Sequence, residues 1–124
     1  MVKVLVVDDH PGCLDSLRLL LESEGFEVQT AEDGPQALSV AAGFRPDVLV
    51  VDWRLGLPLD GIDVAQALQT TNPALQSIVI SGHSAAESDP RIKLPLIVGF
   101  LAKPFRSREL LASIEDAVRA QDKR

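Results

Sequence analysis

The chain has one cysteine, one tryptophan and no tyrosine, and it lacks an apolar run of the roughly 20 residues needed to cross a bilayer. The single cysteine, Cys13, cannot form an internal disulfide, which fits a reducing compartment. The N-terminus has neither the basic region nor the small-residue cleavage site of a secretory signal, so its first apolar run is expected to belong to the fold. These absences predict a cytoplasmic protein that does not enter a membrane.

Clustered basic residues are also lacking. The net charge is -6, and Arg106 and Arg108 come closest to a basic cluster. Since a nucleic-acid-binding surface needs grouped Lys and Arg, direct contact with nucleic acid is not expected. A length of 124 residues, 46% of them hydrophobic, suits one domain with a real core. No repeat or linker interrupts the sequence, and residues 1–124 are predicted to form a single domain.

Short apolar runs alternate with amphipathic segments along the chain. The runs 4–7 and 48–51 are continuous and rich in valine, which is typical of parallel strands buried on both faces. Residues 78–80 and 97–101 follow the same pattern. Residues 26–30 alternate between polar and apolar side chains, which predicts an edge strand with one wetter face.

Helices are predicted between these strands, where apolar residues recur three or four positions apart. The first ends at Gly25, and the second starts near Pro35 and ends at Gly43. The third spans residues 62–71, and the last begins with Ser107 as its N-cap. Strands that alternate with helices imply right-handed crossovers, so the predicted fold is α/β with a doubly wound, five-stranded parallel sheet.

Prolines interrupt the helical pattern between residues 81 and 100. Pro90 can be tolerated only at the first position of a helix, and Pro95 disfavours helix in the residue before it. Only about one turn, over residues 90–93, remains possible. The fourth helix is therefore predicted to be short or missing, with an irregular loop in the rest of the segment.

Polar residues follow four of the predicted strands. Asp8 and Asp9 come after the first, Asp52 after the third, Ser81 after the fourth and Lys103 after the fifth. Ligands of doubly wound sheets bind at these carboxyl ends. Three neighbouring carboxylates repel one another unless a hard divalent cation such as Mg²⁺ binds, and a lysine can pair with a carboxylate or a phosphoryl group. Each residue alone is more simply a turn or a helix cap, but their coincidence at one edge predicts a phosphoryl-transfer site.

The combined motifs resemble the receiver domains of two-component response regulators over the whole chain. The resemblance rests on Val6-Val7-Asp8-Asp9-His10, on Asp52 after its strand, on Ser81-Gly82 and on Phe100-Leu101-Ala102-Lys103-Pro104-Phe105. The stretch Asp52-Trp53-Arg54-Leu55 resembles receivers attached to hybrid sensor histidine kinases more than those of the chemotaxis type. The resemblance implies a flavodoxin-like, three-layer sandwich.

The same resemblance implies a metal and a phosphoryl acceptor. Asp52 corresponds to the nucleophile that becomes an aspartyl phosphate, and it also contributes to the Mg²⁺ site. Asp9 corresponds to a direct ligand of Mg²⁺, Asp8 to a ligand acting mainly through water, and Arg54 to a ligand through its backbone carbonyl.

Further roles implied by the resemblance concern the response to phosphorylation. Lys103 would pair with the phosphoryl oxygens, while the Ser81 hydroxyl and the Gly82 amide would hydrogen-bond to them. Phe100 occupies the position of the switch aromatic residue, but it lacks the hydroxyl of the tyrosine often found there. Arg54 and His83 lie two residues beyond Asp52 and Ser81, where side chains can gate the access of water to the phosphoryl group.

The expected function is a phosphoacceptor switch, phosphorylated by a histidine kinase or a histidine phosphotransfer protein, that slowly loses its phosphoryl group and is not a turnover enzyme. A phosphorylation-independent binding module is the main alternative. A phosphatase would need a second catalytic Asp where Arg54 stands, and a flavin-binding protein would need a phosphate-binding loop after the first strand. Because the fourth helix contributes to the family's dimer surface, a short one predicts a mainly monomeric protein.

Overall fold

The computed structural model describes residues 1–122, so the last two residues of the predicted domain, Lys123 and Arg124, lie outside the described residues. The elements in chain order are β1 (Lys3–Val7), α1 (Pro11–Ser23), β2 (Glu27–Ala31), α2 (Gly34–Phe44), β3 (Val48–Asp52), α3 (Gly61–Thr71), β4 (Gln76–Ser81), the 3₁₀ helices η1 (Ser84–Ser88) and η2 (Pro90–Lys93), β5 (Ile97–Ala102) and α4 (Ser107–Asp122). None of the helices in the described part of the chain has the length and apolar character needed to span a membrane.

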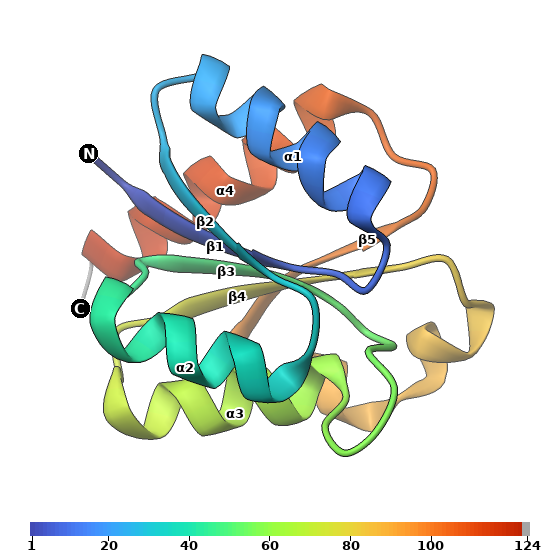
Figure 1. The fold of residues 1–124 in the computed structure, drawn as a ribbon. Coiled ribbons are helices and arrows are strands. Elements are labelled where there is room, and N and C mark those ends of the chain that lie inside the picture. Colours follow the sequence, from blue (N-terminus) through green and yellow to red (C-terminus); the bar gives the residue numbers. More distant parts are fainter. Residues whose placement is uncertain (123–124) are drawn as a thin grey trace.

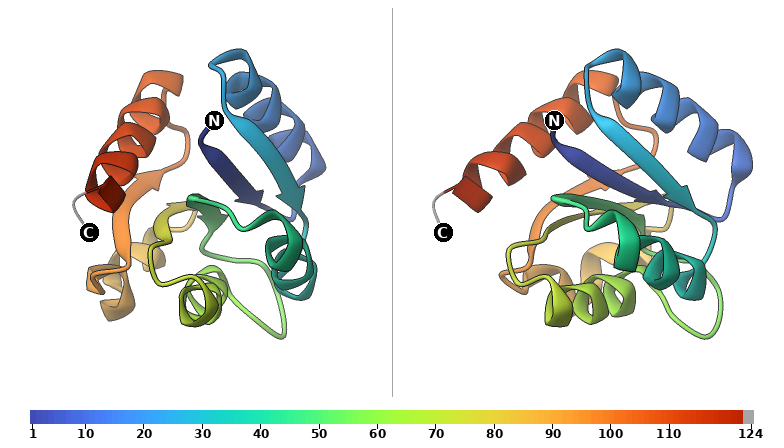
Figure 2. Two further views of the ribbon diagram at one scale, coloured as in Figure 1. Left: turned by 90° about the vertical axis from the view of Figure 1, so that its left-hand side faces the viewer. Right: turned by 60° about the vertical axis from the view of Figure 1, so that its left-hand side comes forward.

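The five strands form one parallel sheet in the order β2-β1-β3-β4-β5. Helices α1 and α4 cover one face of the sheet, and α2 and α3 cover the other (Figures 1 and 2). The predicted α/β, doubly wound, three-layer fold is confirmed, and β2 is an edge strand as expected. The strand order reverses at β1, which places the crevice for a ligand at the carboxyl ends of β1 and β3.

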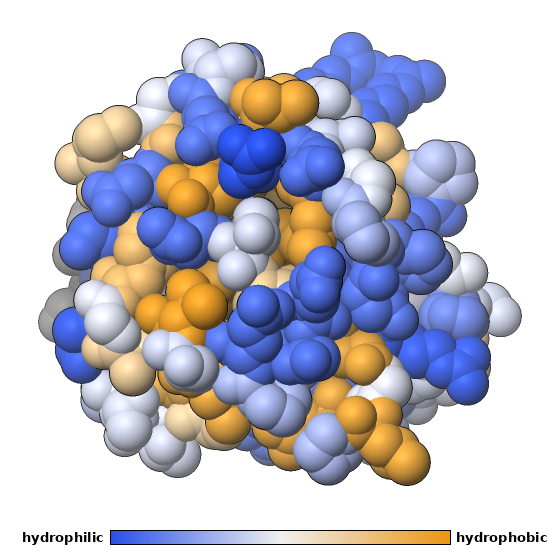
Figure 3. All heavy atoms as spheres, viewed as in Figure 1, coloured by the Kyte–Doolittle hydropathy of each residue, from blue (hydrophilic) through white to orange (hydrophobic). Residues whose placement is uncertain are grey.

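The core has two parts, one on each face of the sheet. In β1 the side chains of Val4 and Val6 pack on the α1 and α4 side, while Leu5 and Val7 pack on the α2 and α3 side. All residues of β3, Val48–Asp52, are buried. Each buried aliphatic side chain contributes roughly 1.5–3 kcal/mol, so this alternation fixes the sheet between its helices. On the face shown in Figure 3, apolar residues are scattered in small groups among hydrophilic ones.

The helix ends were predicted less well than the helices. Gly25 follows α1 with φ of 90°, a conformation that favours glycine, as expected. The predicted end of α2 at Gly43 was wrong, because the helix continues to Phe44 and Arg45 takes the left-handed conformation with φ of 50°. Ser107 is the first residue of α4 rather than its N-cap, and the Arg106 amide before it donates to the Glu109 side chain.

The segment between β4 and β5 is helical but short. Pro90 is the first residue of η2, and the Asp89 side chain caps this turn by accepting a hydrogen bond from the Arg91 amide at 3.0 Å. The predicted turn over residues 90–93 is therefore confirmed. The irregular loop expected before it was wrong, because Ser84–Ser88 form a second 3₁₀ helix. The fourth helix of the prediction is thus present as two short turns rather than missing.

Gly61 allows α3 to begin directly against the end of β3. A Cβ at this position would lie 2.1 Å from the backbone carbonyl oxygen of Asp52, far inside van der Waals contact. The Gly61 amide also donates to the Trp53 carbonyl at 3.0 Å. This close approach sets the position of the chain that follows Asp52.

We expect Gly61→Ala to lower the free energy of unfolding by about 1–3 kcal/mol, because backbone must move to admit the methyl group. Urea denaturation followed by circular dichroism would measure the loss. Gly12→Ala in α1 is the matched control, since a Cβ at Gly12 meets nothing within 4 Å. Equal urea midpoints for Gly61→Ala and the wild type would contradict the packing argument.

Candidate functional site

The predicted site residues meet at the carboxyl edge of the sheet. Asp8 follows β1, Asp52 ends β3, Ser81 ends β4 and Lys103 follows β5. The side chain of Asp8 is fully buried, and Asp52 and Ser81 are nearly so. The parallel register that pairs β1 with β3 and β3 with β4 brings these residues side by side. Residues up to 95 positions apart in the chain therefore share one site.

Lys103 joins two of the carboxylates. Its Nζ donates to Asp8 Oδ2 at 2.8 Å and to Asp52 Oδ2 at 2.9 Å. Its backbone amide donates to the Ser81 carbonyl at 2.7 Å, which fixes the lysine to the end of β4. Burial by itself would lower the pKa of Lys103, but the two carboxylates outweigh it and hold the pKa well above its usual range. The ammonium is therefore charged at neutral pH.

The two carboxylates bound by Lys103 are electrostatically unequal. Burial favours the neutral form of Asp8, but hydrogen bonds from Lys103 and from the His10 amide outweigh it and lower its pKa. Burial raises the pKa of Asp52. The Lys103 ammonium and the Arg54 amide lower it by a smaller amount, and the negative charge of Asp8 raises it further, so the pKa of Asp52 is above its ordinary value. Asp52 is thus the more basic of the two carboxylates.

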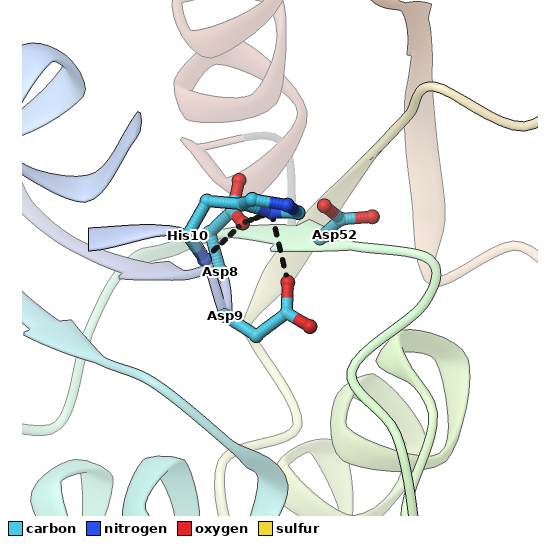
Figure 4. Close-up of side chains that lie close together, drawn as sticks. All are labelled: Asp8, Asp9, His10 and Asp52. Carbon is cyan, nitrogen blue, oxygen red and sulfur yellow. Dashed lines mark hydrogen bonds and ion pairs between the residues drawn. The ribbon is translucent and has the colours of Figure 1, made fainter. Parts of the chain in front are cut away.

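Asp9 and His10 complete the acidic cluster (Figure 4). The Asp9 side chain is 45% exposed, and His10 Nδ1 lies 3.0 Å from its Oδ1 and 3.2 Å from Oδ1 of Asp8. One potential ligand atom from each of Asp8, Asp9, His10 and Asp52 falls within 4.8 Å of the others. No role was predicted for His10, although its position directly after Asp8 and Asp9 in the sequence was a signal for one.

The donor atoms of this cluster fit a hard cation. Three of the four residues offer carboxylate oxygens, which Mg²⁺ and Ca²⁺ prefer, and the imidazole is the least suited member for Mg²⁺. The exposed carboxylate of Asp9 faces solvent, so a partly hydrated ion can reach it. The arrangement is therefore compatible with magnesium.

The predicted switch residues, Ser81 and Phe100, make contacts outside the acidic cluster. The Ser81 hydroxyl accepts from the His83 amide at 2.9 Å and lies 3.3 Å from the His83 carbonyl, while Gly82 is exposed. Phe100 in β5 is half-buried and packs against the core on the α2 and α3 side. Ser81 would have to exchange its local contacts to reach a ligand at Asp52.

The two residues predicted to gate the site line one cleft. Arg54 and His83 are both exposed and lie on a cleft of about 460 Å³ between the loops that follow β3 and β4. The ring of Trp53 lies next to that of His83, with 6.2 Å between the ring centroids. The backbone amide of Arg54 donates to Asp52 Oδ1 at 3.1 Å, so this loop also contacts the buried carboxylate.

Two residues near the site were missed by sequence reasoning. Asp89 caps η2, and its Oδ2 also accepts a hydrogen bond from Trp53 Nε1 at 3.0 Å. Arg91 forms ion pairs with Asp60, Asp63 and Asp89. No local pattern could have indicated the contacts of Asp89 with Trp53 and of Arg91 with Asp60 and Asp63, because these partners are 28 to 36 residues apart.

The family model described as the response regulator receiver domain matches residues 4–115. Together with the fold and the acidic edge, this match shows that the chain belongs to the receiver-domain family of two-component response regulators. The predicted resemblance to the receiver domains of response regulators is thereby confirmed.

Individual relatives agree with this assignment. The chain is 37% identical over 118 residues to the response regulator MprA of Mycobacterium bovis, and this alignment covers 95% of the chain and 51% of MprA. A receiver-domain structure from Clostridium thermocellum superposes with a TM-score of 0.89 at 25% identity, covering 98% of each chain. The Thermotoga maritima response regulator TrrA, solved in complex with Mg(2+)-BeF, superposes with a TM-score of 0.84 at 26% identity, covering 94% of this chain and 99% of TrrA. The chain spans about a quarter to about half of the curated relatives it matches.

Proposed function

We propose that this receiver domain, residues 1–124, is a cytoplasmic phosphoacceptor that takes a phosphoryl group on Asp52 from a histidine kinase or a histidine phosphotransfer protein, with Mg²⁺ as cofactor. The observation that carries the proposal is the ammonium of Lys103 between the buried carboxylates of Asp8 and Asp52. A lysine so placed can neutralise both the nucleophile and the group that it receives.

In the proposed transfer of a phosphoryl group from histidine to Asp52, each side chain of the site has a separate role. A carboxylate oxygen of Asp52 attacks phosphorus, an O–P bond forms, and the P–N bond to the donor histidine breaks with its electron pair left on the imidazole nitrogen, which takes a proton. The Arg54 amide holds Oδ1 of Asp52 during the attack. Lys103 then pairs with the phosphoryl oxygens, and the Ser81 hydroxyl donates to one of them in place of the His83 carbonyl.

The residues that would hold Mg²⁺ are the carboxylates of Asp8, Asp9 and Asp52, with the backbone carbonyl of Arg54. When bound, the ion would neutralise charge on the phosphoryl oxygens. Asp8 already accepts hydrogen bonds from Lys103 and from the His10 amide, which leaves it suited to contact through water. The exposed Asp9 is the better candidate for direct ligation.

We expect Asp9→Ala to weaken Mg²⁺ binding roughly tenfold or more, and Asp8→Ala to weaken it less, because a direct ligand matters more than one that acts through water. Titration of Mg²⁺ followed by the fluorescence of Trp53 would compare the variants. Asp33→Asn, at the N-cap of α2, is a control for loss of an acidic group elsewhere. Equal affinities for the Asp8 and Asp9 variants would contradict the assignment of ligands.

The function itself is tested by incubating the wild-type protein with acetyl phosphate and Mg²⁺ and measuring its intact mass. We expect one added phosphoryl group, and none when EDTA removes the metal. A protein that gains no phosphoryl group under these conditions would instead fit a phosphorylation-independent binding module.

A further inference from the structure

The loop between β3 and α3, residues 53–60, makes hydrogen bonds at both of its ends. At the start, the Trp53 amide donates to the Ile80 carbonyl at 2.8 Å and its indole Nε1 donates to Asp89 Oδ2 at 3.0 Å. At the end, Asp60 caps α3 by accepting a hydrogen bond from the Asp63 amide at 2.8 Å. Both ends are therefore anchored to other elements.

In the middle of this loop, Leu55 and the half-buried Leu59 pack against the core on the α2 and α3 side, while residues 56–58 are exposed. Gly56 has a positive φ of 78°, and Leu57 is 96% exposed. The path of the loop therefore depends on its anchored ends as well as on the side chains of Leu55 and Leu59.

One guanidinium group, that of Arg91 in η2, bridges these ends. Its Nη2 donates to Asp60 Oδ2 at 2.6 Å and to Asp89 Oδ2 at 2.8 Å, and its Nη1 donates to Asp63 Oδ1 at 3.1 Å. Asp89 in turn holds the indole of Trp53. Within residues 1–122, no other ion pair joins the segment between β4 and β5 to α3 or to the loop before it.

The backbone of Arg54 lies inside this bridged loop, directly after Trp53. Its amide contacts Oδ1 of Asp52, and its carbonyl is a proposed ligand of Mg²⁺. A change in the spacing of the loop ends would move both groups relative to Asp52. The planar fork of an arginine suits such a bridge, because it presents several donors in fixed directions, whereas a lysine offers a single charged point.

We propose that Arg91 is a positioning residue for the phosphoacceptor site, which sets the backbone of Arg54 against Asp52 by bridging Asp89 and Asp60 across the loop. This inference rests on the proposed function. It also gives the two short turns that replace a longer helix between β4 and β5 a role in assembling the site.

The test compares Arg91→Gln and Arg91→Lys with the wild type. We expect Arg91→Gln to raise the Kd for Mg²⁺, measured by calorimetry, roughly tenfold, as removal of outer-shell support for a metal site does. Phosphorylation by acetyl phosphate should slow at low Mg²⁺ and recover at saturating Mg²⁺. Arg91→Lys should give an intermediate Kd. Arg18→Gln is the matched control, because Arg18 also pairs with two carboxylates, Asp15 and Glu22, but on α1.

A readout without metal separates positioning from general stability. Hydrogen exchange of the peptide covering residues 53–60 should be faster in Arg91→Gln, while exchange in β1 and β3 stays unchanged. If Arg91→Gln fails to fold, Trp53→Phe removes the hydrogen bond to Asp89 without altering charge, and it should weaken Mg²⁺ binding several-fold.

The outcomes distinguish this inference from the proposed function. Arg91→Gln that binds Mg²⁺ like the wild type, or that loses only stability, would overturn the positioning role and leave the proposed function intact. A wild-type protein that binds no Mg²⁺ and accepts no phosphoryl group would overturn both.

Discussion

Asp52→Asn is expected to abolish phosphorylation by acetyl phosphate and Mg²⁺, with the yield of phosphorylated protein falling at least about 100-fold. An amide is a poor nucleophile, and it cannot form the acyl phosphate that a carboxylate forms. The amide oxygen of an Asn can still accept a hydrogen bond from Lys103, so the fold around the site should persist. Intact mass spectrometry measures the yield, and circular dichroism checks the fold.

Asp15→Asn is the control for this experiment, because Asp15 lies on α1 with its side chain 72% exposed. It should be phosphorylated like the wild type. An Asp52→Asn protein that reaches the wild-type yield would refute Asp52 as the acceptor. Peptide mapping would then show whether Asp8 or Asp9 had taken the phosphoryl group.

Lys103→Met is expected to lower the free energy of unfolding at pH 7 by about 3 kcal/mol, because it leaves the buried carboxylates of Asp8 and Asp52 without a counter-charge. Methionine keeps most of the aliphatic stem, so the loss reflects charge more than packing. The variant should also be phosphorylated far more slowly, since it lacks the cation that pairs with the phosphoryl oxygens. Urea denaturation and intact mass measure the two effects.

The stability loss in Lys103→Met should depend on pH with a definite sign. In the wild type the pKa of Asp8 is lowered, so Asp8 contributes stability above its ordinary pKa of roughly 4 and loses it as the pH falls through the lowered value. Without the ammonium, burial raises the pKa of both carboxylates, and their destabilising charge disappears as they take up protons at acidic pH. The difference between variant and wild type is therefore largest at pH 7 and smaller near pH 4.

Lys93→Met provides the control, because Lys93 is exposed at the end of η2. It should change the free energy of unfolding little at either pH. A constant difference between Lys103→Met and the wild type from pH 7 to pH 4 would show that the electrostatic argument fails.

The exact ends of helices were harder to predict than the helices themselves. Gly43 carried a strong local signal for a helix end, but packing extends α2 to Phe44 and makes Arg45 adopt the left-handed conformation. Phe44 packs against the core on the α2 and α3 side, and this contact stabilises one more helical residue. Such tertiary contacts outweigh a local preference worth about 1 kcal/mol.

The amino-acid sequence by itself determined the order of strands and helices, the burial of β1 and β3, and the gathering of Asp8, Asp52, Ser81 and Lys103 at one edge. Periodicity reports which side chains face the core, and parallel crossovers bring every strand's carboxyl end to the same side. These are local or topological properties, and they can be read from spacing.

Only the tertiary structure decided which side chains pair within that edge. It showed that one ammonium bridges Asp8 and Asp52, and that Arg91 bridges Asp60 and Asp89 beside the loop after β3. Arg91 and Asp60 are 31 residues apart and belong to separate turns, so no periodic pattern connects them. Their contact follows from how η2 packs against the start of α3, which local sequence preferences do not specify.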